Sequence, residues 1–364
     1  MKIGILTWSK VVNHGAVLQA YATQEVLKKM GCTPVMLDYQ ANRQGQQTKL
    51  GYKLRHIGNK LTFHAIKVRK MFTQWMSDKQ EEFDAFRYSE LSLGDFYYVD
   101  QQLDATIIGS DMVFDFFEGY NPFMYGKDVL SPIIFSYAAC FGYTTEKSFD
   151  SFSQKGEICT YLKKMDGISY RDDNTGKILK NCCGINNAVK VIDPVLLYGF
   201  KNEYTTWDSF KWKQRKYVLI YAYTYNMDKS KEVQAICSFA KERELEIISV
   251  GYIHSWCDES INAGPKEFVE LFKYAQYVFT DTFHGTVFSL TFEKQFCTIV
   301  RNNAFKLQDL MDMLGLANRL NASISKEITM LITQPIDYTK VNTCLYHLRQ
   351  KSLKYICDQL KKVE

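Results

Sequence analysis

Short apolar runs alternate with longer amphipathic stretches along most of the chain. The runs are rich in Val, Ile, Leu, Tyr and Phe, and each ends in small or polar residues, where a loop is expected. They occupy residues 3–8, 34–39, 105–111, 133–139, 167–172 and 189–194, and then 217–223, 246–252, 277–281 and 296–300. This alternation of strand and helix patterns predicts an α/β protein with parallel sheets.

The stretches between the runs have helical periodicity. Residues 15–31 place one set of apolar side chains on a single face and end at a glycine. Further helices are predicted over residues 229–244 and 264–275, and an amphipathic helix is predicted over residues 341–361. Each helix therefore follows a strand, as in a parallel sheet with helical crossovers.

A polar stretch, residues 198–216, separates the two sets of strands. We therefore predict two Rossmann-like domains facing a cleft, a GT-B-like arrangement, over residues 1–198 and 212–340. The last helix, residues 341–364, follows the second domain and can pack back on the first. A basic helical insertion is expected in the first domain, at about residues 41–80.

The composition is that of a soluble globular protein, with 46% hydrophobic and 23% charged residues. No apolar stretch approaches the ~18 residues that a membrane-spanning helix needs, and the amino terminus is expected to form a strand rather than a secretion signal. The ten cysteines contain no C-x-x-C pair. We therefore expect reduced thiols, no metal site and a cytoplasmic protein.

Charge is unevenly distributed. Between residues 40 and 77 there are eight Lys and Arg and no Asp or Glu, whereas the net charge of the whole chain is only +5. Apolar positions in this basic arm recur at helical spacing, with Lys53, Lys60, Lys67 and Arg69 beside them. The arm is expected either to pack on the first domain with its charges solvated, or to contact the anionic inner face of the cell membrane. No nucleic-acid partner is expected.

His284 stands between Phe283 and Gly285, where a predicted strand gives way to a helix. Ligands of open parallel sheets bind beyond the carboxyl ends of the strands and at helix amino termini. Similar turns follow the first strand, at Asn13 and Gly15, and the strand that ends at Gly109, Ser110 and Asp111. Neither turn matches a nucleotide-binding fingerprint.

Several segments in this order resemble the polysaccharide pyruvyl transferase family. They are "NHGAVLQAYA", "IIGSDMVFD", "YAACFG", "ISYRDD", "VIDPVLL" and "GPKEFVELFKYAQYVFTDTFHGTVFSL", of which the last is the most specific. The resemblance implies a GT-B-like fold and a transferase that moves pyruvate from phosphoenolpyruvate onto two hydroxyls of a sugar as a cyclic ketal. It also implies a role in capsule, exopolysaccharide or cell-wall glycan synthesis, with an acceptor that can be carried on a polyprenyl diphosphate. No cofactor is expected.

Ketal formation needs an acid, a base and cationic groups that hold a carboxylate and a phosphate. Histidine titrates near neutral pH, so His284 is predicted to be the general acid or base. Asp281 is expected either to orient His284 or to cap the following helix. Arg171 is predicted to hold an anion bidentately, the alternative being a surface ion pair with Asp172 or Asp173.

The remaining predicted substrate contacts lie in the turns. They are Asn13, Gly15, Gln19, Ser110, Asp111, Thr282, Gly285 and Lys306. Gln19 could instead be a solvated helix position, and Asp111 could simply close a turn. Asp193 is interpreted as turn chemistry, and His14 could stack on the acceptor. Thr282 stands where some family members carry an arginine, and Lys306 is the position nearest to an arginine that relatives often show, so the cations that hold the donor are open.

Two other functions fit the same pattern. A GT-B glycosyltransferase would share the architecture but would use a nucleotide sugar as its donor. A non-catalytic glycan-binding assembly protein would keep a degenerate site. Release of phosphate, release of nucleoside diphosphate, or binding without turnover distinguishes the three.

Overall fold

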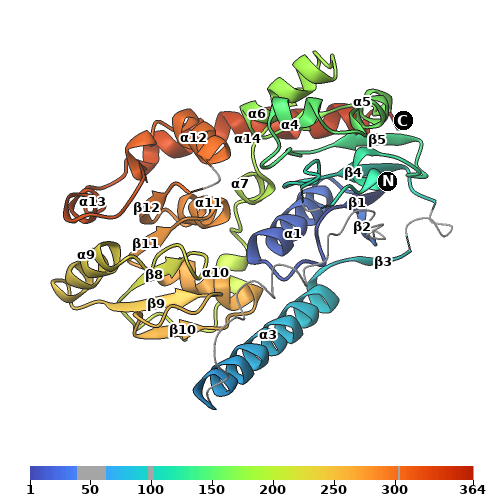
Figure 1. The fold of residues 1–364 in the computed structure, drawn as a ribbon. Helices are drawn as coiled ribbons and strands as arrows, with labels where there is room; N and C mark the ends of the chain where they lie inside the picture. Colours follow the sequence, from blue (N-terminus) through green and yellow to red (C-terminus); the bar gives the residue numbers. More distant parts are fainter. Residues whose placement is uncertain (39–62, 97–101, 118, 302–303, 364) are drawn as a thin grey trace.

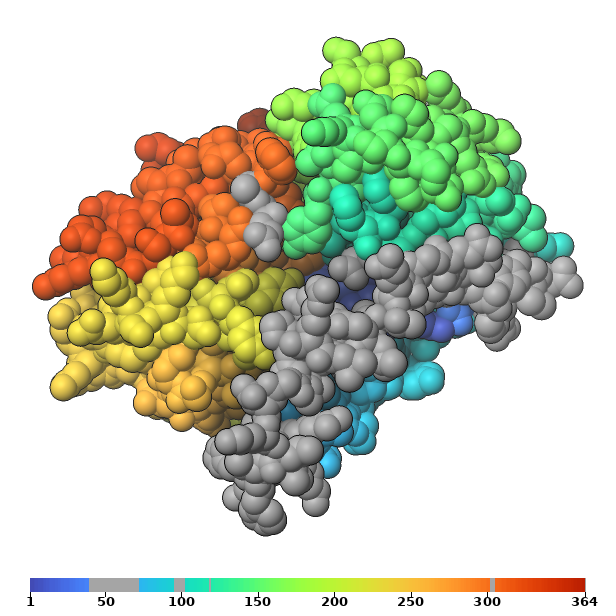
Figure 2. All heavy atoms as spheres, viewed as in Figure 1, coloured from blue at the N-terminus to red at the C-terminus, as the bar shows by residue number. Residues whose placement is uncertain are grey.

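The computed structural model describes residues 1–38, 63–96, 102–117, 119–301 and 304–363. The chain forms two α/β domains that lie side by side (Figure 1). Figure 2 shows the carboxyl-terminal domain, yellow to orange, next to the teal and green part of the amino-terminal domain. One hydrophobic core includes buried side chains of both domains, such as Val17, Phe83, Phe268 and Phe288, so the two domains pack as one body.

The first domain is built on a parallel sheet with the strand order β3-β2-β1-β4-β5. A short parallel pair, β6-β7, continues from β5 through the bridge between Phe135 and Gly167. The strands are β1 (Lys2–Leu6), β2 (Thr33–Asp38), β3 (Leu93–Phe96), β4 (Ala105–Ile108), β5 (Ile133–Ser136), β6 (Ser169–Tyr170) and β7 (Val189–Lys190).

Most described helices of this domain connect its successive strands, and the last two, α7 and α8, follow β7. They are α1 (His14–Lys29), α3 (Phe63–Glu90), η1 (Pro122–Tyr125), α4 (Glu146–Asp150), α5 (Lys155–Lys164), α6 (Asp173–Lys177), the π-helical turn η2 (Ile178–Cys182), α7 (Pro194–Tyr198) and α8 (Glu203–Thr206). Asn13 caps α1 by accepting a hydrogen bond from the Ala16 amide, and Lys28 and Lys29 in its last turn complement the helix dipole.

The second domain repeats the plan with the order β10-β9-β8-β11-β12-β13, again with parallel pairs. Its strands are β8 (Tyr217–Tyr221), β9 (Glu246–Val250), β10 (Glu259–Ile261), β11 (Tyr277–Thr280), β12 (Gln295–Ile299) and β13 (Leu320–Asn321). Its helices are α9 (Ser230–Lys241), α10 (Pro265–Tyr274), α11 (Phe283–Thr291), α12 (Ala304–Met313), η3 (Ala317–Arg319) and α13 (Lys326–Leu331).

This architecture confirms the predicted fold class, an α/β protein with two Rossmann-like domains. In each sheet the first strand of the domain is central, and the strand order reverses beside it. The sequence pattern missed β3, β10 and β13, which are edge strands of two to four residues with polar or exposed positions. Such strands lack the continuous apolar run that marks a buried strand.

The long helix α14 (Tyr338–Leu360) leaves the second domain and returns to the first (Figure 1). Its Tyr355 hydroxyl donates to the Ser136 carbonyl at 3.0 Å, and its Ser352 hydroxyl accepts from the Ile192 amide at 3.1 Å. The chain therefore connects the domains twice, through the segment around α8 and through α14.

Most of the predicted basic arm lies outside the described residues, including Lys53 and Lys60, and so does the surface proposed to contact a membrane. The described part is α3, which continues beyond the predicted end of the arm to Glu90. No helix in the described part of the chain combines the length and the apolar character that crossing a membrane requires.

The prediction that all thiols are reduced is wrong for one pair. Cys159 in α5 and Cys183 just after η2 form a disulfide, with their Cα atoms 5.0 Å apart. The two residues are 24 positions apart and are brought together by the packing of α5 against the segment that follows α6. Sequence spacing alone could not show this contact.

The buried face of α14 predicts a matched pair of stability effects. Ile356 is 2% exposed and packs against the first domain, so Ile356→Ala should lower the free energy of unfolding by about 2–4 kcal/mol through the cavity it leaves. Tyr346→Ala on the exposed face of the same helix should change it by less than about 0.5 kcal/mol. Urea unfolding measures both, and equal effects would mean that α14 does not pack on the first domain.

Candidate active site

Arg171 lies at the centre of a buried charged cluster where strands of both sheets end. It follows β6, and its Nη1 donates to Asp193 Oδ2 at 2.6 Å. Its Nη2 donates to the carboxylate of Asp111, which follows β4. His284, in the first turn of α11, places Nε2 at 3.7 Å from the same Asp193 oxygen, a distance for an ion pair when the imidazole is protonated. The cluster thus joins side chains from both domains.

Both carboxylates of the cluster are held ionised. Burial by itself would raise the pKa of Asp111, but Arg171, Lys306 and His284 outweigh it and the pKa is lowered. Burial likewise opposes ionisation of Asp193, and there His284 and Arg171 keep the pKa below its usual value. The guanidinium of Arg171 is therefore compensated by two negative charges, as a buried cation requires.

A second cation, Lys306 of α12, lies near Arg171, over the ring of Phe283. The Arg171 guanidinium lies 4.3 Å from the centre of the Phe283 ring and the Lys306 ammonium 5.4 Å from it. The face of an aromatic ring attracts both cations and keeps them near each other. Lys306 is half-buried, and its Nζ also lies 3.7 Å from the sulfur of Met112.

Two buried nitrogen atoms of the cluster, Arg171 Nε and His284 Nε2, make no hydrogen bond to a described residue, and the 3.7 Å contact of His284 Nε2 with Asp193 is of ion-pair length only. Buried polar groups are nearly always hydrogen-bonded, so such atoms mark places where a ligand or ordered water completes the site. Both nitrogens belong to side chains that can donate to an anion.

The two domains also come into close contact where the His284 ring lies against Gly15. A Cβ atom on Gly15 would lie 2.1 Å from His284 Nδ1, closer than real contacts allow. Gly15 is in the first turn of α1 and His284 in the first turn of α11, so the amino termini of two helices converge here. Such termini carry positive partial charge and favour anions. Gly15 was predicted as a substrate contact, and the structure shows that its missing side chain makes room for the His284 ring.

Gln19 and Ser110, both predicted to contact substrate, are fully buried and bond to each other. The Gln19 side-chain oxygen accepts from the Ser110 amide and hydroxyl, and its nitrogen donates to Thr7 and to the Ala16 carbonyl. The alternative of a solvated Gln19 is wrong. Through these bonds Gln19 supports the turn that carries Asp111, whose backbone has a φ of 71°, in the left-handed region that non-glycine residues adopt rarely.

The predicted contacts Asn13, Thr282 and Gly285 are used in capping. Asn13 accepts from Ala16, and Thr282 accepts from the Gly285 amide at 2.8 Å. A Cβ on Gly285 would lie 2.1 Å from the Thr280 hydroxyl oxygen, so the glycine is needed for packing inside the domain. These residues therefore help to position His284. The Gly285 amide donates to Thr282, so its hydrogen bond is already used within the protein.

Asp281 does not cap α11, because Thr282 is the capping residue. Its carboxylate accepts from the Tyr223 amide at 3.2 Å and from the Asn226 side chain at 2.6 Å, which ties down the loop between β8 and α9. Burial raises the pKa of Asp281 to about 6, and the bonds from Asn226 and Tyr223 partly oppose the shift. The carboxylate at ion-pair distance from His284 is that of Asp193.

Arg171 and Asp193 differ in part from what was expected of them. Arg171 is not a surface residue paired with Asp172 or Asp173, since it is 5% exposed and bonds Asp111 and Asp193. Asp193 caps α7 through Val195, as turn chemistry predicts, but its second oxygen belongs to the cluster. The sequence feature that could have pointed to Asp193 as a site residue was its position as an acidic residue at a strand end, next to a proline.

His14, expected to stack on the acceptor, is buried instead. Its ring stacks on Phe268 at 4.3 Å, and its Nε2 lies 2.9 Å from the Ala263 carbonyl oxygen. Burial and the nearby Lys79 lower its pKa well below the usual value, so the ring is neutral.

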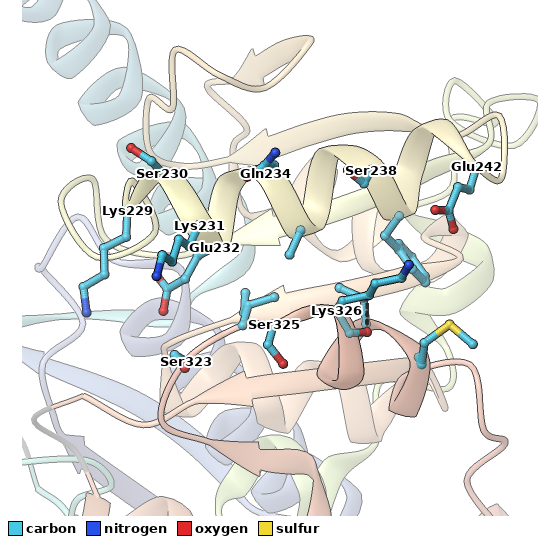
Figure 3. Close-up of a pocket in the computed structure, with 15 residues that line it drawn as sticks. Lys229, Ser230, Lys231, Glu232, Gln234, Ser238, Glu242, Ser323, Ser325 and Lys326 are labelled. Atoms are coloured by element: carbon cyan, nitrogen blue, oxygen red, sulfur yellow. Dashed lines mark hydrogen bonds between the residues drawn. The ribbon is translucent and has the colours of Figure 1, made fainter.

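In the described ranges, no three side chains of His, Cys, Asp or Glu gather in a way that could hold a metal ion. A cavity of about 690 Å³ lies away from the cluster, between α9 and the segment that leads into α13 (Figure 3). Its lining includes the polar residues Lys229, Ser230 and Lys326 and the buried apolar residues Phe239 and Ile324. The charged cluster is therefore the candidate active site.

Similar solved structures are two-domain enzymes of the GT-B type. UDP-GlcNAc 2-epimerase from Neisseria meningitidis bound to UDP-GlcNAc has a TM-score of 0.50 at 12% identity, with 100% of each chain covered. The UDP-GlcNAc 2-epimerase from Methanocaldococcus jannaschii has a TM-score of 0.49 at 12% identity, also covering 100% of each chain. Arabidopsis thaliana UGT89C1 complexed with UDP has a TM-score of 0.48 at 10% identity, covering 100% of this chain and 99% of the other. At these identities the likeness concerns the fold alone.

Fold and cluster together define a two-domain α/β protein with a charged site at the junction of its sheets. The model of the family "Polysaccharide pyruvyl transferase" matches residues 13–303, most of the chain and every residue of the cluster except Lys306. The chain belongs to this family of transferases. A comparison with curated proteins gives no match.

The contact between Gly15 and His284 predicts that adding even a methyl group at Gly15 destabilises the protein. Gly15→Ala should displace the imidazole and lower the free energy of unfolding by about 1–3 kcal/mol, because neither helix start can move without disturbing its cap. Gly156→Ala is the control, since a Cβ there meets no atom within 4 Å. Chemical denaturation should separate the two variants, and equal stability would contradict the close contact.

The raised pKa of Asp281 predicts a pH-dependent stability. Its pKa is about 3.8 when unfolded and about 6 when folded, so its contribution is complete below pH 4 and is lost as the pH rises through 6. The loss amounts to at most about 3 kcal/mol. Asp281→Asn should remove this decline in urea unfolding measured at pH 4 and pH 7, whereas Asp312→Asn, at an exposed position, should leave it in place.

Proposed function

We propose that the cluster transfers pyruvate from phosphoenolpyruvate to two hydroxyls of a sugar, forming a cyclic ketal and releasing phosphate. Family membership supports the transfer of pyruvate. The single observation that carries the proposal is the convergence of two cations, Arg171 and Lys306, on the ring of Phe283, next to His284, whose Nε2 lies 3.7 Å from Asp193 Oδ2. Phosphoenolpyruvate carries a carboxylate and a phosphate, which need such cations.

The charges of the cluster favour an anionic donor. Arg171 and Lys306 balance Asp111 and Asp193, so the four groups together are neutral. An anionic donor is then compensated further by a protonated His284 and by the amino termini of α1 and α11. In the proposal the donor replaces the outer carboxylate, Asp111, on Arg171, while the nearly inaccessible Asp193 remains as the inner partner.

His284 supplies the proton that the reaction consumes. Protonation of the methylene carbon of phosphoenolpyruvate gives a methyl group and positive character at the neighbouring carbon. One sugar hydroxyl adds to this carbon, and a second displaces the phosphate. Of the two hydroxyl protons, one restores His284 and the other leaves with the phosphate. Asp193 stabilises the protonated imidazole and fixes its direction, as carboxylates do for catalytic histidines.

The donor is tested by product analysis. The protein is incubated with a panel of glycosides and either phosphoenolpyruvate or UDP-sugars, and phosphate and UDP are measured together with the mass of the glycoside. Phosphate release with a ketal on the glycoside supports the proposal. UDP release would instead assign a glycosyltransferase.

His284→Ala should lower the rate of phosphate release by about 100-fold or more, the usual scale for a positioned acid or base. The variant should fold, because the only ion pair it removes at the domain junction in the described residues is the 3.7 Å contact with Asp193, and the hydrophobic core shared by the two domains remains. His347→Ala, at an exposed position of α14, is the matched control and should react at the wild-type rate. Wild-type activity in a folded His284→Ala protein would remove His284 from the mechanism.

A further inference from the structure

The two cations of the cluster are carried by different domains. Arg171 follows β6 in the first domain, and Lys306 lies in the first turn of α12 in the second. Arg171 is held by two carboxylates. The Lys306 ammonium instead contacts the Met112 sulfur at 3.7 Å and lies 5.4 Å from the centre of the Phe283 ring. Neither contact is an ion pair, so the position of this ammonium depends on how α12 is held.

Helix α12 is attached to the first domain through Asp309. The Asp309 carboxylate accepts a hydrogen bond from the backbone amide of Asp173, the first residue of α6. Lys190 of β7 pairs with the Asp173 carboxylate at 2.5 Å and lies 3.9 Å from the Asp309 oxygen. The Asp309 side chain is only 17% exposed, so water weakens these interactions less than it would at an open surface. Helices α6 and α12 therefore contact each other across the domain junction (Figure 1).

This contact lies close to both cations along the chain. Asp309 comes three residues after Lys306, and residues at this spacing lie on the same side of a helix. Asp173, the partner of Asp309, comes two residues after Arg171. The hydrogen bond therefore joins the helix that carries one cation to the segment that carries the other.

The segment on the first-domain side is fixed by bonds of its own. The Asp172 side chain caps α6 by accepting from the Thr175 amide at 2.8 Å, and the Thr175 hydroxyl accepts from the Phe141 amide at 2.9 Å. Helix α6 is thus held by its own domain whether or not α12 is present. A displacement of α12 against α6 would move Lys306 relative to Arg171.

We propose that Asp309 is a positioning residue, which sets the distance between Lys306 and Arg171 and thereby favours ligands that carry two anionic groups. Such a ligand gains from both cations only when their spacing matches its own. The inference rests on the proposed function, in which phosphoenolpyruvate presents a carboxylate and a phosphate. Asp309 acts through Lys306 and not by contact with the ligand.

The test compares two anions by calorimetric titration. Phosphoenolpyruvate has two anionic groups and inorganic phosphate has one, which a single cation can hold. Asp309→Ala should weaken phosphoenolpyruvate binding by about tenfold or more, the scale of one lost charge-assisted contact, and phosphate binding by less than about threefold. Asp309→Asn keeps an acceptor for the Asp173 amide and should stay within about threefold for both anions. Asp312→Ala, at an exposed position of the same helix, is the matched control.

A double variant shows whether Asp309 acts through Lys306. In a Lys306→Ala protein, the further change Asp309→Ala should weaken phosphoenolpyruvate binding by less than about threefold, because the cation that Asp309 positions is already gone. Losses that add in full would mean that Asp309 acts in another way, and they would overturn the proposal.

The remaining outcomes also decide it. Wild-type affinity for phosphoenolpyruvate in Asp309→Ala overturns the proposal, and so do equal losses for the two anions, equal losses in the alanine and asparagine variants, or a wild-type protein that binds no phosphoenolpyruvate. If Asp309→Ala does not fold, Lys190→Ala takes its place, and unchanged phosphoenolpyruvate affinity there has the same consequence. Losses as expected, without ketal formation by the wild type, keep the positioning role and reject the proposed function.

Discussion

The structure depends on the burial of one guanidinium between two carboxylates. Removing Arg171 from water is costly, and the cost is offset only while Asp193 and Asp111 both hold it. Those partners come from the ends of β4 and the start of α7, so the ion pairs fix three strand ends of the first domain at one point. His284 of the second domain is placed against the same carboxylate. Electrostatic compensation therefore supplements the shared hydrophobic core where the two domains meet.

The junction around this cluster is rigid for reasons of packing. The absence of a side chain at Gly15 lets the His284 ring rest on the first turn of α1. Helix α3 reaches from the first domain to Gly251, and α14 returns to the first domain from the second. A site that draws its groups from two domains needs such cross-connections, because small displacements of positioned groups reduce catalysis strongly.

Polar residues near the cluster divide into those that support it and those available to a ligand. The side chains of Gln19, Thr282 and Asn13 form hydrogen bonds that stabilise turns and helix amino termini. Arg171 Nε and His284 Nε2, in contrast, make no hydrogen bond to a described residue. Buried polar groups are nearly always hydrogen-bonded, so an unbonded one is a candidate ligand contact. This criterion distinguishes supporting residues from ligand-binding ones better than a position at a strand end does.

The sequence by itself predicted most of the strands and helices in their order, the two-domain fold, and His284 and Arg171 as candidate site residues, because apolar periodicity and strand-end motifs are local properties. It could not show that Asp193 rather than Asp281 faces His284, that Gln19 is buried, or that Cys159 bonds Cys183. Each of these depends on contacts between residues far apart in the chain, such as the 22 positions between Arg171 and Asp193. Only the packing of the two domains decides which polar group finds a buried partner and which is left for a ligand.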